Sequence, residues 1–135
     1  MTAARILGID VALYLIGDFV PQELGSHFEV EPHIAVLKGT ERRNRITGES
    51  RGIHHESTWG CSSATAILSD DIDEHVAWLI KKGASAKGLT GKYAHAFIEV
   101  RIQCGTSCVL PESLLGFARD LNASIGLVAR TSNVT

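Results

Sequence analysis

The feature that most limits the fold is a regular alternation of residue types between positions 94 and 104. Every second residue there is apolar, whereas the positions between hold His95, Glu99, Arg101 and Gln103 together with one aromatic residue. A period of two places neighbouring side chains on opposite faces of a β-strand. The pattern therefore predicts a long strand in a sheet that is covered on one face and largely polar on the other.

Similar patterns predict four more strands, at residues 9–16, 33–38, 58–66 and 124–130. The strand at 33–38 is apolar on both faces, which favours an interior position in the sheet. Three helices are predicted between the strands. The first begins at Pro21, the second is capped by Ser69 or Asp70 and ends at a left-handed Gly83, and the third begins at Pro111.

The element order is β-α-β-β-α-β followed by α-β, which predicts an α+β fold. We expect one antiparallel sheet with helices on one face, in the split βαβ (ferredoxin-like) arrangement, and a last strand that extends this sheet or pairs across it. Trp59, Val76, Ile98 and Leu115 should be largely buried, because each lies on the apolar face of its element. An exposed Leu115 would overturn this topology.

Length and composition fit one domain over residues 1–135, with residues 131–135 as a flexible tail. The net charge of −2 is too small to direct the whole molecule to nucleic acid or a membrane surface. The longest apolar stretch, Val11–Ile16, is far shorter than the roughly 20 residues that span a bilayer. An odd cysteine count, three, is typical of a reducing compartment, so we expect a cytoplasmic protein.

The polar segment from Gly39 to Ser57 is the predicted contact surface. It is interpreted as a long loop, or a hairpin with mobile arms, and as the most mobile internal segment. The guanidinium groups of its arginines suit phosphate or carboxylate recognition, but Glu41, Glu49 and Glu56 partly offset their charge, and a solvated loop is the commoner role of such a segment. No aromatic residue lies between the arginines to stack on a base. The candidate contact residues are Arg42, Arg43, Arg45 and Arg51.

Two other groups of residues could carry chemistry. His54, His55 and Glu56 with Cys61 are the ligand types that zinc prefers, but adjacent histidines point apart in a strand, so a solvated loop is the favoured interpretation. Cys104 and Cys108 lack the two-residue spacing of a redox motif, and core packing is favoured over a regulatory disulfide. We predict no bound metal, no cofactor and no catalytic residue.

A series of short signatures runs through the chain in a characteristic order. They are a first strand ending near Gly17, Pro21-Gln22-Glu23-Leu24, Pro32, Lys38-Gly39, Trp59 followed by small polar residues, a helix through His75–Leu79, and the helix Leu114–Leu121 with its strand. Over residues 11–129 this order resembles the family named domain of unknown function 4279, whose members are small, mostly bacterial proteins. The Arg- and His-rich loop and the segment 104–108 depart from the family pattern. The resemblance implies a fold but no activity.

Three functions remain open at this point. The leading hypothesis is a non-catalytic binding module that masks or recognises another macromolecule, for example an immunity-type protein, because no catalytic spacing is present. The second is a small metal-assisted hydrolase that uses His54, His55 or Cys61. The third is a nucleic-acid or nucleotide binder that uses the arginine-rich loop, although nucleic acid fits the charge poorly.

Overall fold

The computed structural model describes residues 8–84, 86, 95–103 and 109–130. Cys104, Cys108 and the tail 131–135 lie outside the described residues, so the predictions about them stay predictions. The elements are β1 (Ile9–Gly17), α1 (Pro21–Phe28), β2 (Ile34–Val36), β3 (Glu41–Arg43), β4 (Ser50–Ile53), β5 (Ser57–Ser62), the 3-10 turn η1 (Ser63–Thr65), α2 (Ile72–Gly83), β6 (His95–Gln103), α3 (Glu112–Leu121) and β7 (Ser124–Arg130). The predicted α+β class is confirmed.

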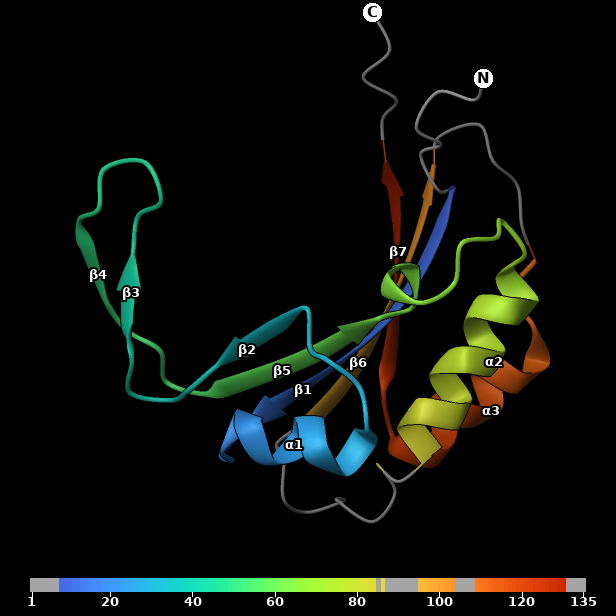
Figure 1. Ribbon diagram of the computed structural model, residues 1–135, viewed down its shortest axis with the longest axis horizontal. Coiled ribbons are helices and arrows are strands. Elements are labelled where there is room, and N and C mark those ends of the chain that lie inside the picture. Colours follow the sequence, from blue (N-terminus) through green and yellow to red (C-terminus); the bar gives the residue numbers. More distant parts are fainter. Residues whose placement is uncertain (1–7, 85, 87–94, 104–108, 131–135) are drawn as a thin grey trace, which may run out of the picture.

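The main sheet has five strands in the order β2-β5-β1-β6-β7 (Figure 1). β1 pairs antiparallel with β5 and β6, and β2 pairs antiparallel with β5, but β7 runs parallel to β6. The expectation of an antiparallel sheet is therefore wrong at its last strand. The chain returns through α3 to the other end of the sheet, so β7 runs in the same direction as β6. β7 extends the sheet, which was one of the two predicted alternatives.

β2 lies at the edge of the sheet and not in its interior, which corrects the prediction for residues 33–38. Ile34 and Ala35 are exposed and Val36 is half-buried. Apolar residues on both faces of a three-residue strand do not require burial, since a short strand can expose single apolar side chains at little cost.

The three helices lie on one face of the sheet, as Figure 1 shows. Phe28 of α1 stacks on Trp59 of β5, with ring centroids 4.8 Å apart. At the end of α2, Gly83 lies against Leu13 of β1 and Phe117 of α3. The core between the helices and this face contains Val11, Leu15, Val76, Leu79, Ile98, Val100, Leu114 and Leu121, besides the residues just named. Trp59, Val76 and Ile98 are buried as predicted.

The ends of α2 differ from the prediction in two details. Its N-cap is Asp71, whose side chain accepts a hydrogen bond from the backbone N–H of Asp73 at 2.9 Å, and not Ser69 or Asp70. Gly83 does not adopt a left-handed conformation; it is the last helical residue and is buried. A glycine is needed there for its size, because a β-carbon would lie 2.7 Å from Cζ of Phe117.

Leu115 is 45% exposed, so the prediction that it is buried is wrong. Leu114, Phe117, Ala118 and Leu121 form the buried face of α3 at the spacing i, i+3, i+4 and i+7. Leu115 lies one residue further round the helix, outside this face. This exposure meets the criterion set against the predicted topology. The predicted strands and helices nevertheless occur in the predicted order, and β3 and β4 are additional strands between β2 and β5.

Candidate functional site

The segment between β2 and β5 forms a β-hairpin that extends from the edge of the sheet (Figure 1). We call residues 39–56 the arm. β3 and β4 pair antiparallel, with Glu41 opposite Ile53 and Arg43 opposite Ser50, and a bulge lies between these pairs. The structure thus favours the hairpin among the two predicted forms of this segment.

Local hydrogen bonds shape both ends of the arm. At its tip, the side-chain oxygen of Asn44 accepts from the backbone N–H groups of Ile46 (2.8 Å) and Thr47 (3.0 Å), and Gly48 donates its N–H to the carbonyl of Asn44 (2.8 Å). Gly48 has a φ of 74°, a conformation that glycine adopts without strain. At the base, Gly39 donates to the carbonyl of His54 at 2.8 Å. The arm is therefore a defined hairpin and not an extended loop.

The four candidate arginines of the arm have different surroundings. Arg43 donates to the carbonyl of Gly48 at 2.8 Å and to a carboxylate oxygen of Glu41 at 2.9 Å, so it supports the hairpin itself. Arg42, Arg45 and Arg51 are exposed, and their side chains make no hydrogen bond or ion pair within the part of the chain that the structure describes. Ile46, at the tip, is 95% exposed.

The structure separates the residues that were considered, and not favoured, as zinc ligands. His54 and His55 belong to the arm, whereas Cys61 is buried in β5 beside Leu13. Burial raises the pKa of the Cys61 thiol to about 12. Among the described residues, no three His, Cys, Asp or Glu side chains come together as a metal-binding group.

A serine, a histidine and an aspartate lie close together at the start of η1. The Ser63 hydroxyl lies 2.6 Å from Nδ1 of His75 and 3.4 Å from a carboxylate oxygen of Asp10. Nε2 of His75 lies 2.6 Å from the carbonyl oxygen of Ser69, which can only accept, so Nε2 carries a proton.

The surroundings of this cluster indicate a structural role. The Ser63 oxygen also accepts from the backbone N–H of Val11 at 2.8 Å, and both Ser63 and His75 have no exposed surface. A nucleophile needs access to its substrate, which Ser63 lacks. Sequence reasoning missed His75 because it treated the buried face of α2 as purely apolar.

The open face of the sheet carries a polar and aromatic cluster around Tyr14. The Tyr14 hydroxyl accepts from Nη2 of Arg101 at 2.9 Å and lies 3.0 Å from Nε2 of His33. The guanidinium of Arg101 also pairs with Glu99 and lies 3.8 Å from the carboxylate of Asp10. Alternation on the strand at 94–104 predicted the polar face, but not the pairing of β6 with β1 that brings these groups together.

Charge within this cluster is nearly balanced, which limits what it can bind. Burial lowers the pKa of the Arg101 guanidinium, but its hydrogen bond to Glu99 and the nearby carboxylates outweigh that effect and raise it. Partial burial, aided by the charge of Arg101, lowers the pKa of His33 below 6.5, against the opposing hydrogen bond with Gly60. Because Glu99 and Asp10 already surround Arg101, we do not assign this cluster as an anion site.

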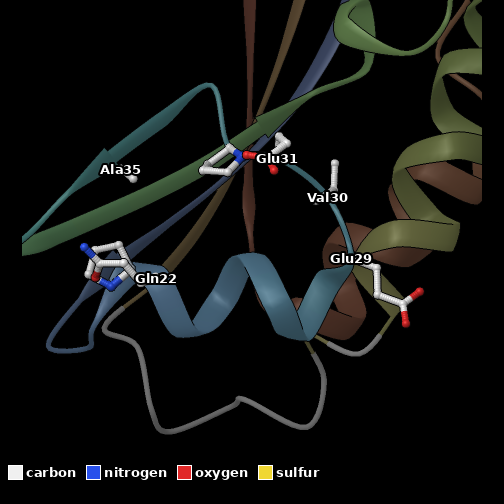
Figure 2. A pocket seen from close by; sticks show the side chains of 7 residues that line it. Gln22, Glu29, Val30, Glu31 and Ala35 are labelled. Atoms are coloured by element: carbon white, nitrogen blue, oxygen red, sulfur yellow. The ribbon is translucent and has the colours of Figure 1, made fainter.

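A hollow lies between α1 and the edge strand β2, with a volume of about 530 Å³. Figure 2 shows side chains around it from the start of α1, from the segment between α1 and β2, and from β2 itself, with the Glu29 carboxylate directed away from β2. Apolar and acidic side chains line it together, and no polar groups converge as they do in a catalytic pocket. The lining residues are Pro21, Gln22, Glu29, Val30, Glu31, Pro32 and Ala35.

Comparison with known proteins gives one match. The family model described as domain of unknown function (DUF4279) matches residues 7–130. No curated protein and no solved structure matches the chain. No helix in the described part of the chain is both long and apolar enough to cross a bilayer.

Proposed function

Because the chain belongs to the DUF4279 family, which is described only as a domain of unknown function, we propose a function from its own geometry. The protein is a non-catalytic binding module that recognises an acidic surface of another macromolecule through its arm. The observation that carries this proposal is the hairpin of residues 39–56. It presents Arg42, Arg45 and Arg51, which have no side-chain partner among the described residues, and a nearly fully exposed Ile46 at its tip.

The physical basis is the combination of exposed guanidinium groups with a preformed backbone turn. A guanidinium group forms paired hydrogen bonds with a carboxylate or phosphate, and three such groups on one hairpin give geometric selectivity. An exposed isoleucine at the tip adds apolar area that is buried on binding. Since the tip hydrogen bonds of Asn44 already define the turn, the backbone loses little conformational freedom on association.

The test compares two variants that lose the same charge at different places. R42Q/R51Q removes two cations from the arm, and K81Q/R119Q removes two exposed cations from α2 and α3. Partners are captured from an extract of the native cell with each protein and quantified by mass spectrometry. We expect a partner that the arm variant loses and the helix variant retains, with weaker capture at high salt, since exposed charges are screened over about 10 Å at 0.1 M.

Two results would contradict the proposal. Equal capture of every partner by the folded arm variant would exclude the arginines as contacts. Equal loss in both variants would show that total charge, and not the arm, controls binding. Circular dichroism and urea unfolding of each variant confirm that the protein remains folded.

We further infer that β1, β2, β5 and β6 with α1 and α2 form a split βαβ (ferredoxin-like) core. The strand order β2-β5-β1-β6 and the antiparallel pairing of each neighbouring pair support this arrangement. The arm then occupies the connection between two neighbouring strands of that core, where an insertion does not disturb the sheet. An experimental structure with a different order of these strands would overturn this inference.

A further inference from the structure

β7 is an edge strand that lacks the usual protection of sheet edges. Within the described part of the chain it pairs only with β6, in a continuous register from Phe97 opposite Ser124 to Gln103 opposite Arg130, with no bulge. Its sequence Ser-Ile-Gly-Leu-Val-Ala-Arg has no proline and no charge before Arg130. Proteins normally protect long edges with proline, internal charges, bulges or short strands. The opposite edge follows this rule, because β2 has only three residues.

The C-terminal half of β7 also exposes apolar side chains. Leu127 is 63% exposed and Val128 is 40% exposed. Successive residues point to opposite faces of a strand, so the exposed apolar surface lies on both sides of the edge. In Figure 1 this half of the strand extends beyond the helices, whereas Ile125, nearer the start of the strand, packs against the core.

We propose that β7 pairs with β7 of a second copy of this chain, antiparallel about a two-fold axis at Leu127. A strand edge binds another strand, because its free N–H and C=O groups require main-chain partners. In this register Leu127 lies opposite its own counterpart, Gly126 lies opposite Val128, and Ile125 lies opposite Ala129. Each larger residue beside the axis thus faces a small one, and the pattern is complementary to itself.

The pairing has a consequence for the whole assembly. Two five-stranded sheets become one continuous sheet, with β2 of each copy at its two outer edges. The arms, which follow β2, then lie at opposite ends of the dimer. This inference is independent of the function proposed for the arm, because β7 and the arm occupy opposite edges of the sheet.

The first experiment measures the mass of the full chain in solution by sedimentation equilibrium. We expect a concentration-dependent dimer whose dissociation constant rises about tenfold or more in L127K, because two lysines then face each other at the axis. The control is I53K, since Ile53 is also an exposed apolar strand residue, 51% exposed, but lies on the arm. Association that is unchanged in L127K, or abolished in I53K, would overturn the proposal, as would a chain that remains monomeric up to about 1 mM.

The second experiment tests the register by oxidation. In a C104S/C108S background, L127C should form a disulfide-linked dimer, because residues opposite each other in an antiparallel pair lie within disulfide distance. V128C should link far more slowly, since Val128 faces Gly126 of the second copy. Cys61 can stay in place because it is buried. Faster linkage of V128C than of L127C would refute this register.

Discussion

Replacing Gly83 by alanine tests how closely α2, α3 and β1 pack. The added β-carbon would lie 2.7 Å from Cζ of Phe117 and 3.2 Å from Cδ2 of Leu13, whereas carbon atoms in favourable contact lie about 3.5–4.0 Å apart. Both neighbours are buried and cannot turn into solvent. Overpacking of this kind costs about 1–3 kcal/mol, and the helix preference of alanine returns at most about 1 kcal/mol.

Gly116 provides the matched control for this change. It lies within α3, and a β-carbon there would meet no atom within 4 Å. G116A should therefore stabilise the protein by about 0.5–1 kcal/mol through helix preference alone. We expect the free energies of unfolding of G83A and G116A to differ by about 1–3 kcal/mol, with G83A the less stable.

The assay is urea unfolding monitored by tryptophan fluorescence. The slope of the unfolding free energy against urea concentration should be the same in all variants. A double-mutant cycle with F117L identifies the cause, because a smaller side chain should make room for the new methyl group and reduce the cost of G83A. If G83A is as stable as G116A, or if F117L leaves its cost unchanged, the packing argument for Gly83 is wrong.

Three further predictions follow from single residues. L114A should lower the free energy of unfolding by about 2–5 kcal/mol and L115A by less than about 1 kcal/mol, because only Leu114 is fully buried; equal losses in urea unfolding would contradict the observed rotation of α3. NMR titration should give His33 a pKa below 6.5 in the folded protein, so the unfolded state binds the proton more tightly. The stability that His33 contributes is therefore present above pH 6.5 and is lost as pH falls through its folded pKa. R101Q should raise the pKa of His33, and an unchanged value would exclude the charge effect of Arg101. In a variant that keeps only Cys61, alkylation at neutral pH should be slow until urea unfolds the protein, and rapid labelling of the native form would refute its raised pKa.

Local patterns predicted the elements well because their signals are short-range. Alternation located β1 and β6, and the acidic and basic residues at the two ends of α2 located that helix. The strand at 58–66 was predicted too long, because Ser63 leaves β5 to begin η1. There the Ser63 hydroxyl contacts His75 at 2.6 Å and the backbone N–H of Val11 at 2.8 Å, and a local pattern does not reveal contacts with these other elements.

Strand pairing and side-chain packing were harder to predict from the sequence. The edge position of β2 and the direction of β7 depend on which strands lie beside them, and the residue types of a strand do not determine its neighbours. The size requirement at Gly83 depends on Phe117, which a pattern in α2 cannot reveal. For the candidate site, composition located the arm. Only the structure separates Arg43, which supports the hairpin, from the other three arginines, whose side chains have no partner among the described residues.

The central position of β1 determines when the fold can form during synthesis. Among the described strands β1 is synthesised first, yet its two neighbours in the sheet are β5 and β6. Ala12 pairs with Ser62 on one side and with Glu99 on the other. Until residue 103 has emerged, one edge of β1 has no partner among the described strands. The side chains of β1 that are buried in the complete fold then lack some of the residues that they pack against. Such non-local pairing slows folding and exposes intermediates to aggregation. A nascent chain that ends before β6 should thus depend on chaperones, whereas one that extends past β7 should not.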